Sequence, residues 1–250
     1  MLKFTIMPQD SDAAVHRKVD NPSRIIASLV TLCVAKPQNY GSPDAVDAHD
    51  KPWTTGFFKK PFYGSLFLGK TNLIGDGQAD LKYHGGADKA VLAYSADNYP
   101  LWKNEINLEL PHGAFGENFT IAGLCEQTVC LGDVYAIGSA RVQVSQPRQP
   151  CWKLGRRWRM NELVAMVIAN GRTGWYLRVL EEGTVAPGMP LTLLDRPEGA
   201  WSVARANHIL HHCKTDAQLT RLLAEVSPLS QSWKDTLLER LARLEHRESA

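Results

Sequence analysis

Short apolar stretches rich in β-branched and aromatic residues recur along most of the chain, separated by turns that contain glycine or proline. Stretches of this length and composition predict strands rather than helices. We expect strands at 24–34, 63–68, 89–94, 128–137, 141–145, 175–180 and 190–194. Many short strands with scattered helices are typical of a barrel. The sequence therefore predicts a mostly β (α+β) fold, in which helices flank a β-barrel.

Two segments among these strands have helical spacing instead. Ser95 can cap a helix whose apolar residues recur at intervals of three and four, at Tyr99, Trp102 and Ile106. A second helix is expected at 162–169, ended by Asn170 and Gly171, because glycine readily takes the left-handed conformation that closes a helix. The segment 36–62 contains several proline steps and predicts a long loop. Such loops are commonly functional or mobile.

The pattern changes near the end of the chain to three apolar stripes at helical spacing. Ser202 and Asp216 are the expected caps of the first two helices. Each stripe is too short to be stable alone, so the helices must bury against one another or against the barrel. We therefore divide the chain into an N-terminal extension (1–24), a barrel domain (25–198) and a three-helix C-terminal domain (199–250).

Composition narrows the class of protein. A hydrophobic fraction of 44% in 250 residues allows a sizeable core, and a net charge of +2 argues against general affinity for nucleic-acid polymers. Five cysteines form no CxxC pair, which indicates reduced thiols and a cytoplasmic protein. The longest apolar stretch, 25–35, is too short to span a bilayer, so we expect no membrane contact.

Cys151 is the strongest candidate for chemistry. It follows Pro150, in a region without acidic residues from 148 to 161 that contains Arg148, Lys153, Arg156, Arg157 and Arg159. Nearby cations favour the thiolate, which attacks electrophiles and binds soft metals. The cluster suits a small anionic ligand, to which Arg148 offers a bidentate fork. The alternative is that Cys151 is a small buried hydrophobe, as most free cysteines are.

A glycine pair earlier in the chain suits an anion as well. His84 and Lys89 flank Gly85 and Gly86, and glycines let the backbone approach a ligand closely because they have no Cβ. Taken alone, this run is more typical of an ordinary turn with a structural histidine.

The run 115–118 offers polar groups for a second wall of a site. Glu117 can accept hydrogen bonds, and Asn118 can both donate and accept them. A tight turn in which Asn118 caps backbone groups is an equal alternative. Upstream, Asp76 and Gln78 could orient His84, although we favour a role in holding a turn.

Three runs occur in a fixed order, Gly75-Asp76-Gly77-Gln78 with His84-Gly85-Gly86, then Phe115-Gly116-Glu117-Asn118 with Leu131-Gly132-Asp133, then the segment around Cys151. Together they resemble the MOSC domain family. With the C-terminal three helices, the chain is similar to the YiiM type of that family over roughly 25–245. The resemblance implies that Cys151 is catalytic and ligates the metal of a molybdenum cofactor (molybdopterin). The rest of that cofactor would bind to His84, Gly85, Gly86, Lys89, Glu117, Asn118 and Arg148.

The resemblance also implies an activity, the reduction of small N-hydroxylated compounds such as N-hydroxylated purines. The chain has no dinucleotide-binding, flavin or iron–sulfur motif, so a separate electron-donor protein is implied. A cofactor carrier without turnover is one alternative. A sulfur carrier that uses a Cys151 persulfide ranks last, because the sulfur-generating domain of sulfurases is absent. The three-helix domain could bind the redox partner, form a homodimer contact or cover the barrel.

Overall fold

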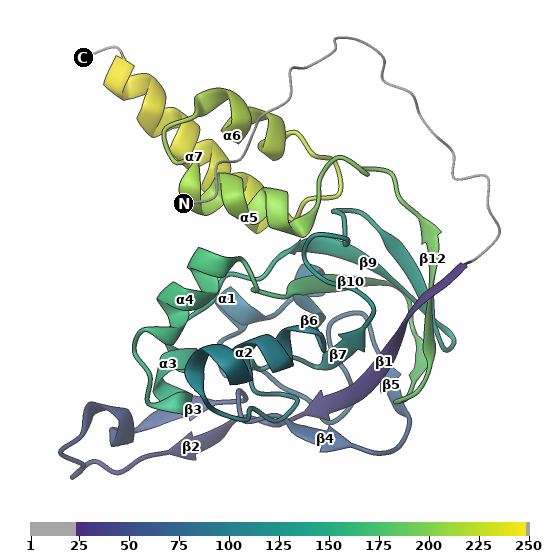
Figure 1. Ribbon diagram of the computed structural model, residues 1–250, viewed down its shortest axis with the longest axis vertical. Coiled ribbons are helices and arrows are strands. Elements are labelled where there is room, and N and C mark those ends of the chain that lie inside the picture. Colours follow the sequence, from purple (N-terminus) through teal and green to yellow (C-terminus); the bar gives the residue numbers. More distant parts are fainter. Residues whose placement is uncertain (1–23, 249–250) are drawn as a thin grey trace.

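The computed structural model describes residues 24–248, so the extension expected at 1–24 lies outside it apart from Arg24. Within this range seven strands close a mixed barrel in the order β12-β8-β9-β10-β6-β7-β1, because β1 also pairs with β12 (Figure 1). Only β6 and β7 run parallel among these pairs. The strands are β1 (Arg24–Val34), β6 (Val91–Ser95), β7 (Phe119–Ala122), β8 (Val134–Ile137), β9 (Ala140–Pro147), β10 (Trp175–Glu181) and β12 (Pro190–Asp195). The predicted fold class is therefore confirmed.

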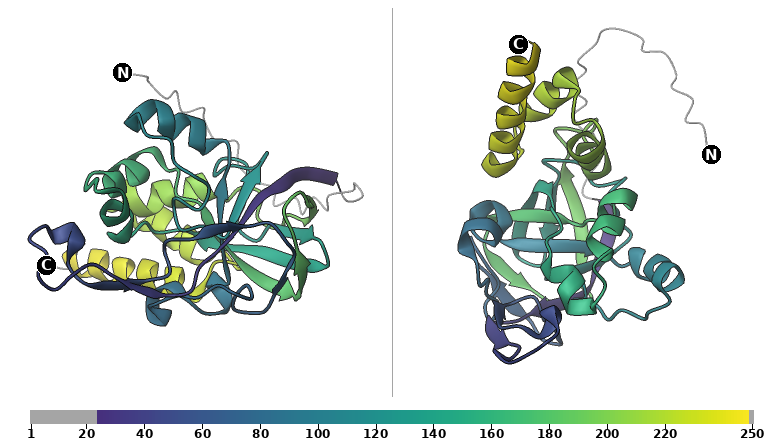
Figure 2. Two further views of the ribbon diagram at one scale, coloured as in Figure 1. Left: turned by 90° about the horizontal axis from the view of Figure 1, so that it is seen from below. Right: turned by 90° about the vertical axis from the view of Figure 1, so that its left-hand side faces the viewer.

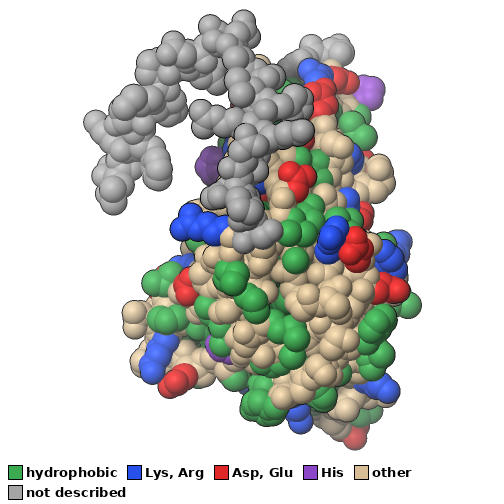
Figure 3. Space-filling model, turned by 90° about the vertical axis from the view of Figure 1, so that its right-hand side faces the viewer, with side chains coloured by type: hydrophobic (Ala, Val, Ile, Leu, Met, Phe, Trp, Pro, Cys, Tyr) green, Lys and Arg blue, Asp and Glu red, His purple; other side chains and the backbone are tan. Residues whose placement is uncertain are grey.

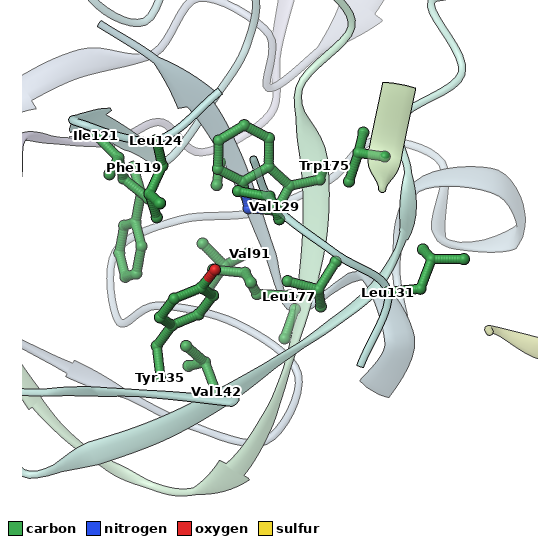
Figure 4. Close-up of a cluster of buried hydrophobic side chains, with 14 of the residues drawn as sticks. Val91, Phe119, Ile121, Leu124, Val129, Leu131, Tyr135, Val142, Trp175 and Leu177 are labelled. Carbon is green, nitrogen blue, oxygen red and sulfur yellow. The ribbon is translucent and has the colours of Figure 1, made fainter. Parts of the chain in front are cut away.

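The barrel interior is filled by alternate side chains of its strands. Val91, Phe119, Tyr135, Val142 and Trp175 come from five different strands and meet there, each at most 1% exposed (Figure 4). Full burial of one apolar side chain of this kind contributes about 1.5–3 kcal/mol. The interior is thus a packed core, and any ligand must bind outside it.

Helices cover the barrel on one side and at one end (Figures 1 and 2). They are α1 (Leu81–His84), α2 (Asn98–Ile106), α3 (Lys153–Trp158), α4 (Leu163–Asn170), α5 (Val203–His212), α6 (Ala217–Ala224) and α7 (Gln231–Glu248). As predicted, Gly171 closes α4 in the left-handed conformation, with φ of 73°. Ser202 and Asp216 cap α5 and α6 by accepting backbone hydrogen bonds from Arg205 and Leu219.

The three C-terminal helices bury their apolar stripes in the same hydrophobic cluster as the barrel. Val203 and Ile209 of α5, Leu223 of α6, and Trp233 and Leu237 of α7 all belong to it. The helices therefore cover the barrel, one of the three roles expected for them. No helix within the described range is long and apolar enough to cross a membrane.

The segment 36–62 is more ordered than the predicted loop. It contains β2 (Gln38–Tyr40) and β3 (Trp53–Thr55), which pair as an antiparallel hairpin, and β4 (Lys60–Phe62), which pairs with β1. The prediction of a loop was wrong because each strand has only three residues, too few to show an alternating pattern between the prolines. The strand expected at 63–68 is observed as the shorter β5 (Leu66–Leu68), whose partner β11 (Gly183–Val185) was not predicted.

Two other boundaries differ from the sequence prediction. Ser95 is the last residue of β6 and not a helix cap, since α2 begins at Asn98. The apolar segment 128–133 is a turn before β8, in which the Asp133 carboxylate accepts the Cys130 backbone N–H. The segment pairs only through an isolated bridge between Cys130 and Ser202, and Val129 and Leu131 are buried.

Candidate functional site

Residues from all three sequence motifs line one cavity at the side of the barrel that faces α1, α3 and the β2–β3 hairpin. The cavity measures about 570 Å³ including its open mouth. Of the predicted site residues, the structure brings His84, Lys89, Asn118, Arg148 and Cys151 into its wall. Gly85, Gly86 and Glu117 do not line it.

Cys151 is placed by the two elements on either side of it. Strand β9 ends at Pro147, and α3 starts at Lys153 with the Leu154 N–H donating to the Cys151 carbonyl at 3.1 Å. The thiol is half-buried, makes no disulfide and faces the cavity. The alternative of a packed structural cysteine therefore does not describe its position.

Arg148 is a buried cation that forms no ion pair with any residue of the described range, 24–248. Its side chain lines the cavity, and the residue is only 3% exposed. Nη2 donates to the Phe115 carbonyl at 3.1 Å, whereas the buried Nη1 has no partner. A buried charge that is neither paired nor fully hydrogen-bonded is costly. The site is thus incomplete without an acceptor, and an anion in the cavity would supply it.

The rest of the wall has the same sign of charge. Four cations line the cavity, and no aspartate or glutamate does; they are Lys59, Lys89, Arg148 and Lys153. Of these, only Lys59 forms an ion pair in the described part of the chain, with Asp76. Such a one-signed surface concentrates anions.

Burial affects the pKa of both His84 and Lys89, and the neighbouring cations also affect that of His84. Burial lowers the pKa of His84 to about 4, with smaller contributions in the same direction from Lys153 and Arg148. Burial also lowers the pKa of Lys89, whose Nζ donates to the Tyr83 carbonyl at 2.9 Å. At neutral pH His84 is therefore an uncharged hydrogen-bonding group among cations.

Gly85 and Gly86 join His84 to Lys89 behind this wall. Gly86 has φ of 93°, a conformation that favours glycine, and its carbonyl accepts the Lys89 N–H at 3.0 Å. The pair thus turns the chain so that the two polar side chains reach the same cavity. The structure supports the turn as the role of these glycines.

Glu117 is placed behind the wall and not in it. The residue is fully buried, and its carboxylate accepts the Gly113 N–H at 2.6 Å, the Phe115 N–H at 3.1 Å and the Thr120 hydroxyl at 3.0 Å. The Tyr99 hydroxyl donates to it as well. These hydrogen bonds stabilise the turn. The carboxylate is therefore not placed to bind a ligand in the cavity.

Asn118 lines the cavity, but its side-chain amide already forms hydrogen bonds with other groups of the protein. Its Oδ1 accepts the Leu92 N–H at 3.1 Å, and its Nδ2 donates to the Cys33 carbonyl at 3.2 Å and to Asp76 at 2.8 Å. The structure thus favours the alternative in which Asn118 caps backbone groups. Its contribution to the site is to fix the floor of the cavity.

Lys59 is a cavity residue that the sequence did not reveal. It is 7% exposed, and its ammonium donates to Asp76, which also accepts the Ala35 N–H at 2.9 Å. Burial lowers the pKa of Lys59, although Asp76 opposes this. The only signal in the sequence is a lysine in the proline-rich segment 36–62, for which the sequence predicts a loop.

The basic residues after Lys153 do not line the cavity but bind the β2–β3 hairpin and the segments around Phe57 and Gly113. Arg156 donates to the backbone carbonyls of His49 and Lys51, and Arg157 donates to the Phe57 and Gly113 carbonyls at 2.9 and 2.7 Å. Arg159 forms ion pairs with Asp47 and Asp50. The expectation that the whole cluster faces a small anion was therefore too broad.

The residues that could ligate a metal are few. Within residues 24–248, no group of three or more histidine, cysteine, aspartate or glutamate side chains gathers as it does around a metal held by protein ligands alone. Cys151 is the one thiol in the cavity wall. A metal bound there would need most of its ligands from a cofactor.

Comparisons with known proteins identify the family of this fold. The MOSC domain model matches residues 80–192, and the model of the YiiM-like 3-alpha helix domain matches 201–244. A Bacillus subtilis protein, YflK, is 46% identical over 82% of this chain and 93% of its own length. The crystal structure of YiiM from Geobacillus stearothermophilus superposes with a TM-score of 0.72 at 37% identity, covering 86% of this chain and 99% of that one.

A further relative is longer than this chain. A protein of Gibberella moniliformis named a reductase is 34% identical over 75% of this chain, but the match covers only 34% of that protein. About two thirds of it therefore has no counterpart here.

Proposed function

Because the chain belongs to the MOSC domain family in its YiiM-like form, we propose that it binds a molybdenum cofactor in this cavity and reduces small N-hydroxylated compounds, such as N-hydroxylated purines. Cys151 would ligate the metal. The observation that carries the proposal is the cation-lined cavity in which buried Arg148 has an unpartnered Nη1 beside a half-buried thiol.

The residues present fit the cofactor on two counts. Its phosphate needs fixed cationic donors, and Arg148, Lys89 and Lys153 provide them without a competing carboxylate. Its metal needs one soft protein ligand, since its dithiolene sulfurs supply others, and Cys151 is the only such ligand in the wall. When bound, the cofactor supplies two-electron redox chemistry next to the thiol.

Each turnover would consume two electrons, which must then be replaced from outside the site. Conversion of R–NHOH to R–NH₂ breaks the N–O bond, takes up two electrons and two protons, and releases water. We propose that a separate electron-donor protein provides the electrons. The name of the reductase relative supports a reduction as the reaction type.

The remaining features suit a protein that works in the cytoplasm. All five cysteines are free, two of them fully buried and three half-buried. Free thiols persist in reducing compartments.

The decisive experiment compares Cys151→Ala with Cys125→Ala, since Cys125 is also half-buried and free but does not line the cavity. Both variants and the wild type would be purified from cells that make the cofactor, and molybdenum and pterin would be measured. We expect near-stoichiometric molybdenum in the wild type and Cys125→Ala, and its loss in Cys151→Ala with an unchanged circular dichroism spectrum. Equal molybdenum in all three proteins would refute the ligand assignment.

Turnover separates the enzyme from the carrier. With chemically reduced methyl viologen as donor, the loaded wild type should convert an N-hydroxylated purine to its amine, measured by chromatography. Bound cofactor without turnover would favour the carrier instead. A persulfide on Cys151 found by mass spectrometry, without molybdenum, would favour the sulfur carrier.

A further inference from the structure

Exposed apolar side chains gather at the rim of the cavity. Leu81 and Tyr83 of α1 are 71% and 60% exposed, and Trp152, between Cys151 and α3, is 57% exposed. In the sequence these residues lie within three positions of His84 or Cys151, which line the cavity, and Lys153 next to Trp152 lines it as well. Aromatic residues this exposed typically mark a binding surface when they form a patch.

The two sides of the mouth repeat one chemical pattern. On α1, the Lys82 ammonium lies 5.2 Å from the ring centre of Tyr83; at α3, the Lys153 ammonium lies 6.0 Å from the ring centre of Trp152. Neither lysine forms an ion pair in the described part of the chain. The nearest acid on α1, Asp80, accepts the Lys82 and Tyr83 backbone N–H groups as the helix cap. The rim is therefore both apolar and positively charged.

We propose that this rim, formed by Leu81, Lys82, Tyr83, Trp152 and Lys153, docks an acidic protein that carries single electrons. The inference rests on the proposed function, which needs an external donor and leaves its contact site open. Electron transfer requires the donor's redox group to come close to the reacting centre, and the rim brings a partner directly over Cys151. Interfaces of this kind are small, with aromatic anchors for affinity and charges that speed association.

Other surfaces fit this role less well. The three C-terminal helices bury their apolar stripes in the barrel core. On the face shown in Figure 3, apolar side chains lie scattered among charged and uncharged polar groups. Exposed residues of that kind, such as Ile25 and Leu194 on the paired strands β1 and β12, do not line the cavity. Scattered exposed apolar residues are ordinary on protein surfaces, whereas the rim residues are close in sequence to residues that line the cavity.

The test uses the cofactor-loaded protein with two donors, a reduced acidic flavodoxin and reduced methyl viologen. The variant is Lys82→Glu with Tyr83→Ala. Its matched control is Lys60→Glu with Tyr63→Ala, an exposed lysine and tyrosine that are outside the cavity wall. We expect the rim variant to lose at least about tenfold in kcat/KM for flavodoxin. Its rate with methyl viologen, a small donor that needs no docking surface, should equal that of the wild type.

The dependence of the flavodoxin reaction rate on ionic strength gives a second test. Raising the ionic strength should slow the flavodoxin reaction of the wild type and of the control, because long-range attraction between exposed charges is screened. The rim variant should show a weaker dependence on salt. A rim variant that keeps wild-type kinetics with flavodoxin would overturn the proposal, as would an equal loss in the control variant.

Binding to the cofactor-free chain separates this inference from the proposed function. Calorimetry with oxidised flavodoxin should detect an interaction with the wild type that the rim variant loses, whether or not the loaded protein reduces N-hydroxylated compounds. Absence of turnover with methyl viologen would refute the proposed function alone. Absence of flavodoxin binding, or a rim that instead holds a homodimer together in analytical ultracentrifugation, would overturn the docking site.

Discussion

Replacement of Arg148 by methionine should leave the folding stability nearly unchanged or raise it, but should weaken the binding of an anion in the cavity. The variant loses the hydrogen bond from Nη2 to the Phe115 carbonyl, worth about 1.5–3 kcal/mol for a charged donor. It also removes a buried cation that has no carboxylate partner, and the burial of such a charge costs several kcal/mol. The two effects offset each other. We expect the cofactor-free variant to unfold within about 1 kcal/mol of the wild type, or to be more stable.

Anion binding should weaken in the same variant. A phosphate in the cavity would lose one charge-assisted hydrogen bond, about 1.5–3 kcal/mol, which is about 10- to 150-fold in affinity. Urea unfolding and calorimetry with inorganic phosphate on the cofactor-free protein measure the two quantities. Arg156→Met is the matched control, because Arg156 binds the hairpin carbonyls of His49 and Lys51 and lies outside the cavity wall.

The control should lose stability and keep its affinity for phosphate. If Arg148→Met instead destabilised the protein by more than about 3 kcal/mol and left phosphate binding unchanged, Arg148 would be a structural residue. The reasoning from its unpartnered Nη1 would then be refuted.

Two further predictions concern the cavity wall. Burial lowers the pKa of His84 from 6.5 to about 4. Between these two pH values the unfolded chain binds a proton that the folded chain does not. The contribution of His84 to stability should therefore be complete above pH 6.5 and decrease as the pH falls toward 4. His84→Gln should reduce that loss in urea unfolding series across this range. At Gly116, φ is 79° and a Cβ would lie 2.7 Å from the Phe57 ring, so Gly116→Ala should lower the free energy of unfolding by about 1–3 kcal/mol. Unchanged thermal unfolding would contradict this.

The sequence predicted most of the barrel because its long strands carry a strong local signal. The predicted strand 24–34 coincides with β1, and the expected caps Ser202 and Asp216 are observed. Strands of three residues, such as β2 and β3, have too few positions for alternation to show. The segment between them contacts residues that are distant in sequence, since Arg156 binds the His49 carbonyl and Arg159 forms an ion pair with Asp50.

The site was predictable in outline, but the role of each side chain was not. A motif shows which residue types occur together, yet Glu117 and Arg148 are both buried polar residues of such motifs. What separates them is the number of partners each finds in space. The carboxylate of Glu117 accepts hydrogen bonds from four groups of its own chain, whereas Nη1 of Arg148 finds none. Only the folded structure shows that difference, which leaves Arg148 and not Glu117 with an unused donor.

The basic segment after Cys151 contacts both the cavity and the β2–β3 hairpin. Lys153 lines the cavity, while Arg157 holds the carbonyls of Phe57 and Gly113 from the same short helix. Phe57 is itself part of the cavity wall, and its ring packs against the glycine of the 115–118 turn. The helix that follows Cys151 is therefore hydrogen-bonded to another part of the cavity wall. The run of cations that the sequence predicts as a single anion site thus divides in the structure, where Lys153 lines the cavity and the arginines after it bind other segments of the chain.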